Sequence, residues 1–501
     1  MKKNIASYTW LLVGVFFMLF SNGRWILPVA VWTYPIFFLR FLRLQKPARG
    51  FLVLLLTIAV INPIIFWKII PAPINVYLLL ACLAMQLTTL SFLADRLLAT
   101  RLSGFISTLI FPAAWCSIEY VMSLIPSKGS WLALPYTQAD NLSLMQLASV
   151  TGIWGISFLI TWFASIINWV WLQNFEWNKI RKGVIVFTSV SAAVMLFGTI
   201  RLNFFQPQTS SVLTASIVQP RDINKSLLTC SWTDSRSIGN YSAALETNLL
   251  EKTIQAAQAG AKIILWQEGA GWLPEQEESK FIERASQVAS TENIYLLMTL
   301  WTVPEDYPNH LVENKMLMIN PDGTTQFAYI KSHPVSVEPI VKGNAIVPAI
   351  AQTQYGRIAA AICFDGDFPN FIRQAGKNKT DILFLPANDW KEVDPLHTNM
   401  QITRAIENGF SLVHAAGQGL SVATDNRGKI ISSLDYYATD KQVMYADVPI
   451  KQSFTIYTTI GDAFAWLCIA GFVSSVMLVS FKKRSAAKIV GAKNIKAGLA
   501  G

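Results

Sequence analysis

Long apolar stretches are the feature that most limits how this chain can fold. About eight occur, and most approach or reach the roughly 20 residues that an α-helix needs to cross a bilayer. The sequence is 52% hydrophobic and only 14% charged, which is unlike a soluble protein. We therefore expect a polytopic α-helical membrane protein with about eight spans. The stretches cover residues 5–20, 25–39, 51–67, 74–94, 104–125, 152–172, 184–200 and 460–481.

Positive charges predict the orientation of these spans. Lysines and arginines gather at alternate ends of successive spans, whereas the opposite ends carry only Arg24, Lys68 and Lys128. Because positively charged loops stay in the cytoplasm, we expect both termini inside the cell and the segment between the last two spans outside. The net charge of +10 is therefore a topology signal and not a sign of nucleic-acid binding. The clustered residues are Lys2, Lys3, Arg40, Arg43, Lys46, Arg49, Arg96, Arg101, Lys179, Arg181, Lys182, Lys482, Lys483 and Arg484.

A segment of soluble composition separates the last two spans. Short apolar runs alternate there with helical patterns, which predicts a layered α/β domain. We therefore expect a transmembrane domain of about seven spans in residues 1–202, an external domain in 203–456, and a final span with a basic cytoplasmic tail in 457–501. The expected strands cover residues 212–219, 262–266, 294–300, 315–319, 358–362, 381–385 and 410–415, and the expected helices cover 241–259, 276–290 and 395–407.

Cys363 stands where an apolar run ends in the sequence R-I-A-A-A-I-C-F-D-G-D-F-P, residues 357–369. The run at 358–362 predicts a strand buried on both faces, and the following Asp-Gly-Asp predicts a turn and the start of a helix. Reactive groups concentrate at the C-terminal ends of such strands, because side chains there face a crevice. The alternative is a buried cysteine that acts as a small hydrophobic residue.

Two other reactive side chains share this setting. Glu268 comes shortly after the strand expected at 262–266, and Lys331 comes directly after a strand expected at 324–330. A carboxylate, an ammonium group and a thiol are the parts that acyl transfer through a thioester requires: a base, a cation for the oxyanion and a nucleophile. The alternative is that Glu268 and Lys331 only end their strands and face solvent.

The remaining cysteines and histidines form no recognisable metal or disulfide pattern. The five cysteines show no C-x-x-C spacing, and the four histidines show no paired ligand spacing, so we expect no metal and no cofactor. His333 and His397 are alternative bases. We expect His333 to form hydrogen bonds within a loop and His397 to lie on the helix that precedes R-A-I-E.

The order Glu268, Lys331, Cys363, together with I-C-F-D-G-D-F-P and the later R-A-I-E-N-G, resembles the nitrilase, or carbon–nitrogen hydrolase, superfamily. Three further motifs are similar to those of apolipoprotein N-acyltransferases, and with them the resemblance covers essentially the whole chain. These motifs are W-L-A-L-P-Y-T-Q at 131–138, G-I-W-G-I-S-F-L-I at 152–160 and T-I-Y-T-T-I-G-D at 455–462.

The resemblance implies an αββα sandwich with Cys363 as nucleophile, Glu268 as general base and Lys331 as oxyanion stabiliser. It also implies a second active-site glutamate, Glu338, and supporting roles that we assign to Phe364, Asp365 and Asn388. The implied reaction takes an acyl chain from a membrane phospholipid onto the cysteine and passes it to the N-terminal amine of a diacylglyceryl-cysteine lipoprotein. The implied location is the bacterial inner membrane, with the catalytic domain on the periplasmic side.

The sequence also departs from the family pattern. Gln267 stands where proline usually precedes the catalytic glutamate, Phe364 and Asp365 replace a usual Tyr-Glu pair, and the loop after Lys331 is one residue short. Asn388 and the two residues after it match the family's Asn-Asp loop only in part. Two other functions therefore stay open: a membrane-tethered amidase or nitrilase that acts on a small periplasmic amide, and a non-catalytic lipoprotein-binding homologue.

Overall fold

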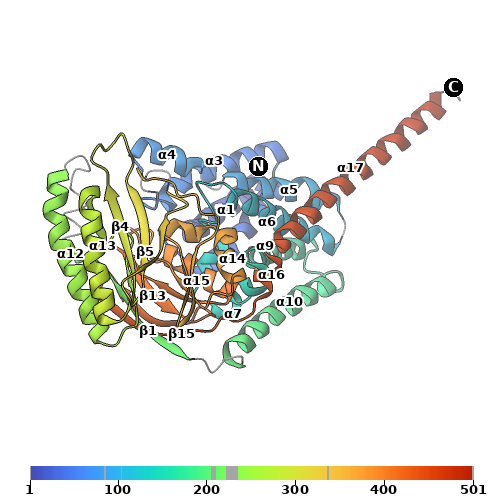
Figure 1. The fold of residues 1–501 in the computed structure, drawn as a ribbon. Helices are drawn as coiled ribbons and strands as arrows, with labels where there is room; N and C mark the ends of the chain where they lie inside the picture. Colours follow the sequence, from blue (N-terminus) through green and yellow to red (C-terminus); the bar gives the residue numbers. More distant parts are fainter. Residues whose placement is uncertain are drawn as a thin grey trace.

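The computed structural model describes residues 2–70, 72–83, 86–102, 104–204, 210–221, 235–335 and 338–498, so Cys230 lies outside the described residues. A bundle of helices packs against an α/β domain, and the C-terminal helix projects away from both (Figure 1). The chain thus contains the helical and the α/β parts that the hydropathy pattern predicts.

Each predicted apolar stretch coincides with helical structure. Six of the helices in the described residues are long and apolar enough to span a membrane, as a multi-pass membrane protein requires. The helices α1 and α2, with 17 residues each, are not among these six, so the count of eight spans stays a prediction. The main helices are α1 (Lys2–Met18), α2 (Pro28–Leu44), α3 (Pro47–Ile65), α4 (Ile74–Leu83), α5 (Thr89–Leu98), α6 (Ile110–Ser123), α9 (Trp154–Leu172), α10 (Trp177–Phe204) and α17 (Ala463–Gly498), with short turns η1 (Gln86–Thr88), η2 (Ala99–Arg101), η3 (Phe105–Leu109), η4 (Leu134–Gln138), α7 (Leu142–Met145) and α8 (Ala148–Thr151) between them.

Helix α3 shows why this bundle needs lipid around it. Its outward face carries Leu52, Leu56 and Val60, which are 55%, 57% and 67% exposed. Residues four apart lie on one face of a helix, so these side chains form a continuous apolar stripe. A soluble protein would bury such a stripe, whereas hydrocarbon solvates it.

Two β-sheets form the middle of the α/β domain. The first is seven-stranded, in the order β15-β1-β2-β4-β5-β6 with β3 paired to β4, and the second is six-stranded, in the order β14-β13-β11-β9-β8-β7. A further pair, β10 (Ala387–Asn388) and β12 (Ala416–Gly417), lies outside both sheets. The strands are β1 (Ser211–Ile217), β2 (Ile263–Trp266), β3 (Gly271–Pro274), β4 (Tyr295–Val303), β5 (Glu313–Ile319), β6 (Thr325–Ile330), β7 (Ala349–Thr353), β8 (Gly356–Ala360), β9 (Ile382–Phe384), β11 (Ser411–His414), β13 (Leu420–Thr424), β14 (Ile430–Asp435) and β15 (Val443–Pro449).

Helices cover the outer faces of the two sheets. Helices α12 (Ser235–Gln258) and α13 (Glu275–Glu292) lie along the first sheet, and α15 (Leu396–Asn408) packs on β11 and β13 of the second sheet, with α14 (Pro369–Lys377) beside it (Figure 1). The alternation along β2 separates the layers, because Ile264 and Trp266 join the core under α12 and α13 whereas Ile263 and Leu265 face the second sheet. The predicted αββα sandwich is confirmed.

The predicted elements of this domain are present, and others were not predicted. All the expected strands and helices appear, most with shifted ends. The strands for which we identified no sequence signal are β3, β7, β10, β12, β13, β14 and β15. Helix α10 ends at Phe204 and β1 begins at Ser211, and the three-part division of the chain stays a prediction.

Buried polar contacts fix the α/β domain to the helical bundle. Arg404 on α15 is fully buried, and its guanidinium pairs with Glu407 at 3.0 Å and donates a hydrogen bond to the Tyr136 hydroxyl at 2.8 Å. Glu407 in turn accepts a hydrogen bond from the backbone N–H of Ile153 at 3.2 Å. The backbone N–H of Ser130 donates to the carbonyl of Asp367 at 2.8 Å. Loops of the bundle therefore contact the turn that begins with Cys363.

Gly409, which ends α15, packs closely against the backbone of Ser453, and its substitution provides a test of the structure. Its φ of +73° lies in the left-handed region, and a Cβ there would overlap the carbonyl oxygen of Ser453. We expect Gly409→Ala to lower the free energy of unfolding by about 1–2 kcal/mol from the backbone conformation alone, with the clash in addition. Thermal unfolding in detergent micelles measures the loss. Gly471→Ala is the matched control, since a Cβ at this position on α17 meets nothing within 4 Å; equal melting temperatures for the two variants would contradict the prediction.

Candidate active site

The three predicted catalytic residues lie between the two sheets, at the ends of three strands. Glu268 follows β2 and Lys331 follows β6 in the first sheet, and Cys363 follows β8 in the second. Their exposed fractions are 1%, 0% and 6%. Buried ionisable groups are costly unless they have partners, so the contacts among them decide what the site can do.

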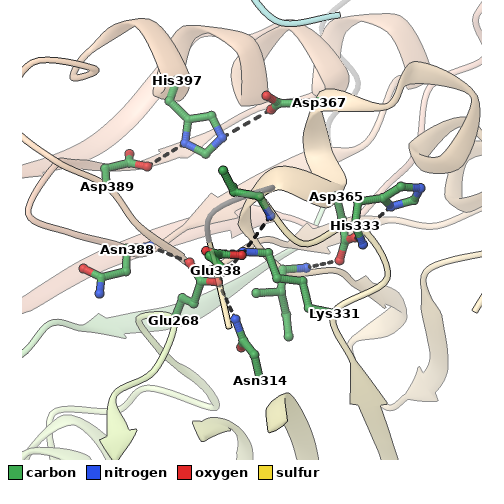
Figure 2. A network of polar contacts seen from close by, with 12 residues as sticks. Glu268, Asn314, Lys331, His333, Glu338, Asp365, Asp367, Asn388, Asp389 and His397 are labelled. Atoms are coloured by element: carbon green, nitrogen blue, oxygen red, sulfur yellow. Dashed lines mark hydrogen bonds and ion pairs between the residues drawn. The ribbon is translucent and has the colours of Figure 1, made fainter. Parts of the chain in front are cut away.

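Lys331 is held between two carboxylates (Figure 2). Its Nζ donates to Glu268 Oε1 at 2.8 Å and to both oxygens of Glu338 at 3.0 Å. Burial disfavours the ammonium form, but the thiolate form of Cys363 and the charges of Glu268 and Glu338 outweigh it and raise the pKa of Lys331 well above its ordinary value. Burial and the charge of Glu268 raise the pKa of Glu338. The structure thus leaves one permanent cation in this part of the site.

Glu268 has three hydrogen-bond donors around it. Besides Lys331, the Asn314 side-chain amide donates to Oε1 at 2.7 Å and the backbone N–H of Asn388 donates to Oε2 at 2.8 Å. These contacts fix both carboxylate oxygens in position. Asn388 therefore supports the site through its backbone, and its side-chain oxygen accepts a separate bond from Gln418 at 3.3 Å.

Cys363 begins a short turn, η5 (Cys363–Asp367), with an unusual backbone conformation. Its φ is +49°, which is uncommon for any residue except glycine, and its N–H donates to the carbonyl of Pro386 at 2.7 Å. A strained residue on a sharp turn after a strand is the arrangement in which hydrolases present a nucleophile. Burial and the charge of Glu268 raise the pKa of Cys363, against the opposing effect of Lys331. The thiol is therefore protonated at neutral pH and requires a base to react.

Asp365 holds the loop after Lys331 against this turn. Its carboxylate accepts hydrogen bonds from the Tyr329 hydroxyl at 2.7 Å, from the backbone N–H of His333 at 2.8 Å and from that of Ile362 at 3.0 Å. His333 Nδ1 lies 2.9 Å from the same carboxylate, so His333 is a loop hydrogen-bonding residue, as predicted. Phe364 is buried, with its ring edge-on to that of Phe368 at 5.3 Å. Asp365 acts through the loops it connects.

Gln267, where the resemblance leads one to expect proline, is part of the packing between β1 and β2. Its N–H donates to the carbonyl of Ile217 and its side-chain oxygen accepts from the N–H of Gln219, both at 2.9 Å. Proline has no N–H and could not form the first of these bonds. The substitution therefore changes the support behind Glu268 and leaves Glu268 in place.

A second polar cluster lies on the other side of Cys363. His397 lies on α15, as predicted, with its ring between Asp389 and Asp367 at 2.7 and 3.2 Å (Figure 2). Donor atoms of Cys363, Asp389 and His397 all lie within 4.8 Å of one another, a spacing that could hold a metal ion. Both ring nitrogens already face carboxylates, so this geometry favours an ion-paired imidazole over a metal ligand.

Asn314 and Asp367 were not among the predicted site residues, His397 was considered only as an alternative base, and Asp389 only as part of a loop that matches the family pattern in part. Asn314 had a signal in the sequence, because it lies on β5 in step with Met316 and Met318, whose side chains face the second sheet. A polar residue at an inward position of a strand requires a partner. The aspartates had no such signal, since their contact with His397 joins segments that are separate in the chain.

Comparison with known proteins shows which families and proteins this chain is similar to. The family model described as Carbon-nitrogen hydrolase matches residues 232–453, and the one described as Apolipoprotein N-acyltransferase N-terminal domain matches residues 7–166. The chain is 24% identical to the apolipoprotein N-acyltransferase of Geobacter metallireducens over 81% of this chain and 80% of that protein. It is 27% identical to that of Shewanella oneidensis over 75% of this chain and 74% of that protein. Among solved structures, an amidase from Nesterenkonia sp. is 18% identical, covering 52% of this chain and 97% of its own, with a TM-score of 0.38.

Proposed function

Because this chain belongs to the apolipoprotein N-acyltransferase family of the carbon–nitrogen hydrolase superfamily, we propose that it transfers an acyl chain from a membrane phospholipid to a lipoprotein. The acceptor is the N-terminal amine of a diacylglyceryl-cysteine apolipoprotein, and the carrier is a thioester on Cys363. The reaction takes place in the bacterial inner membrane, with the α/β domain on the periplasmic side. The observation that supports this proposal is the buried Cys363 on a strained turn, which lies between the same two sheets as the fixed Glu268–Lys331 ion pair.

The first half-reaction forms the thioester. Glu268 accepts the proton of the Cys363 thiol, and the sulfur attacks the ester carbonyl of the phospholipid. Lys331 stabilises the negative charge that develops on the carbonyl oxygen, and Glu338 holds the Lys331 ammonium group from its other side. The ester C–O bond breaks, and the lysophospholipid leaves with the proton that Glu268 held.

The second half-reaction transfers the acyl group. The lipoprotein amine attacks the thioester carbonyl, Glu268 accepts the amine proton, and the C–S bond breaks to give an amide and a thiol. Both substrates are lipid-anchored. A catalytic domain joined to membrane helices at each end holds its nucleophile close to the membrane surface, which reduces the entropy lost when the substrates meet.

Intact mass spectrometry tests the proposal. Purified full-length protein is incubated with phosphatidylethanolamine alone, and then with a diacylglyceryl lipopeptide. We expect a mass gain of one acyl chain that the lipopeptide removes, which is the behaviour of a double-displacement enzyme. If no adduct forms in folded protein but a small amide releases ammonia without lipid, the chain is an amidase. Lipopeptide binding without any acyl-enzyme would indicate a non-catalytic homologue.

Glu268→Gln should separate two effects of Glu268: its role as the base that accepts the thiol proton, and the effect of its charge on the pKa of Cys363. Since the charge of Glu268 raises the pKa of Cys363, its loss should increase alkylation of Cys363 by iodoacetamide at a fixed pH below that pKa. Acyl-enzyme formation should nevertheless fall by about 10²–10⁴-fold, because no base accepts the thiol proton. Peptide mass spectrometry measures the alkylation at Cys363.

The matched control for this experiment is Glu278→Gln, which removes the carboxylate of another glutamate–lysine pair, 2.7 Å from Lys315 and outside the site. It should change neither rate. A decrease in both rates for Glu268→Gln would contradict its assignment as the base, because slower alkylation means that the variant disturbs Cys363 itself.

A further inference from the structure

His397 connects two segments of the chain. One of them carries the proposed nucleophile, Cys363, and the other orients the proposed base, Glu268. The residue is 5% exposed, with Nδ1 at 2.7 Å from Asp389 Oδ1 and Nε2 at 3.2 Å from Asp367 Oδ1. Figure 2 shows the ring between the two carboxylates, which approach it from opposite sides. The His397 ring therefore links the segment that contains Asp367 to the segment that contains Asp389.

Each aspartate belongs to a different part of the active site. Asp367 is the last residue of η5, the turn that Cys363 begins. Asp389 follows Asn388, whose backbone N–H holds Glu268 Oε2 at 2.8 Å. A bridge from Asp367 to Asp389 therefore connects the turn that begins with Cys363 to the loop whose backbone binds Glu268.

The charges around His397 favour its protonated form. Asp367 and Asp389 are 1% and 3% exposed, and among the described residues the Oδ2 atom of each has no hydrogen-bond partner. Burial disfavours the imidazolium, but these two carboxylates outweigh it and raise the pKa of His397 well above its ordinary value. Buried carboxylates require a cation, and a doubly protonated ring supplies an N–H to each.

The other groups that face this ring are few in the described part of the chain. His414 lies with its ring centre 6.1 Å away, and Gln401 Nε2 lies 2.8 Å from His397 Nε2 and 3.1 Å from Asp367 Oδ1. The remaining charged or titratable neighbours are Cys363 and Asp394. An amide nitrogen only donates, so the contact between Gln401 Nε2 and His397 Nε2 is a hydrogen bond only when that ring nitrogen carries no proton. When the ring is doubly protonated, Nε2 donates to Asp367 and the Gln401 amide must turn away from the ring. The direct bridge to both carboxylates therefore depends on the second proton.

We propose that His397 is a positioning residue whose imidazolium forms ion pairs with both Asp367 and Asp389. We call this pair of contacts the clasp. It keeps Cys363 and Glu268 at a fixed distance from each other. The inference rests on the proposed function for the reaction that the two groups perform. The clasp transfers no proton to substrate. It fixes the distance between nucleophile and base, a quantity to which reaction rates are steeply sensitive.

The test compares His397→Gln and Asp389→Asn in two assays on the full-length protein in detergent. His397→Gln removes the imidazolium charge and at least one of the two contacts with Asp367 and Asp389. Asp389→Asn removes the negative charge that pairs with Nδ1 of the ring. In acyl-enzyme formation from phosphatidylethanolamine, both variants should be slower by about 10- to 100-fold, because either change opens the clasp. The rate with the double variant should be close to that of either single variant, since the two residues act as one unit.

Alkylation of Cys363 by iodoacetamide across pH should respond with opposite signs. Loss of the imidazolium raises the pKa of the thiol, whereas loss of the Asp389 charge, which raises that pKa in the native protein, lowers it. Residues acting only through their charge would shift acyl-enzyme formation in opposite directions too, so a faster Asp389→Asn enzyme would overturn the clasp. His310→Gln is the control, since His310 pairs with Asp306 at 2.7 Å on the surface with a side chain 78% exposed.

The alkylation assay also separates this inference from the proposed function. If the native protein forms no acyl-enzyme, the proposed function fails, and the clasp is judged by a double-mutant cycle between His397→Gln and Glu268→Gln on the pKa of Cys363. A clasp that positions Glu268 predicts shifts that are not additive, and additive shifts would overturn it. Asp367→Asn is the second variant for the same cycle, should His397→Gln not fold.

Discussion

Cys363→Ser should abolish the acyl-enzyme and reduce acyl transfer by about four orders of magnitude or more. A serine hydroxyl at this position has the same surroundings, but it is a far weaker acid than a thiol. General-base assistance by Glu268 is therefore far less effective for this hydroxyl than for the thiol. Serine also forms an oxygen ester, from which an amine displaces the acyl group more slowly than from a thioester.

Intact mass spectrometry of the Cys363→Ser protein with phosphatidylethanolamine measures the first effect, and transfer of a labelled acyl chain to a lipopeptide measures the second. Cys82→Ser is the matched control, because Cys82 is a free, partly exposed cysteine on α4. We expect it to keep both activities. A thioester that persists in Cys363→Ser and vanishes in Cys82→Ser would move the nucleophile to another cysteine and remove the basis for the proposed mechanism.

Lys331→Met should damage both stability and catalysis. The side chain is fully buried between Glu268 and Glu338, so its removal leaves two carboxylates without the cation between them. Removing one partner of a buried ion pair costs about 3–5 kcal/mol. Loss of the cation that we propose as oxyanion stabiliser should slow acyl-enzyme formation by about 10²–10³-fold in addition.

The pH dependence of the stability that the Lys331 ion pairs contribute follows from the direction in which the pKa of Lys331 is shifted. Since the pKa of Lys331 is raised above its ordinary value of 10.5, its contribution is fully present below that value and is lost only as the pH rises through the higher folded value. At neutral pH the native protein therefore has the full benefit, and the Lys331→Met variant should melt at a lower temperature throughout this range.

A double variant separates the two effects of Lys331. Adding Glu338→Gln to Lys331→Met removes one of the two unpaired carboxylates, so the melting temperature should recover in part. Acyl-enzyme formation should not recover, because the oxyanion still lacks its cation. If stability and activity recover together, Lys331 has only a structural role, and the assignment of the oxyanion stabiliser is wrong.

Local patterns in the sequence determined the general architecture and the predicted catalytic residues. Hydropathy alone located eight apolar stretches that coincide with helices, because a bilayer imposes a length and a composition on any segment that crosses it. Strand-end positions made Glu268, Lys331 and Cys363 candidates, because strand ends in layered α/β domains bring such residues together. The resemblance to carbon–nitrogen hydrolases then selected these three. The structure brings Lys331 into contact with Glu268, as the strand-end positions predict, and with Glu338, which only the resemblance implied.

Tertiary structure alone decided which other groups complete the site. His397, Asp367 and Asp389 come from a helix, a turn and a loop, and no periodicity links them. The same holds for the contact of Ser130 with Asp367, which joins residues 237 positions apart. Such contacts arise from how whole layers pack, and each polar group then takes whichever partner the packing provides. Sequence patterns report burial and local geometry, whereas the choice of partners for buried charges is made only when the chain has folded.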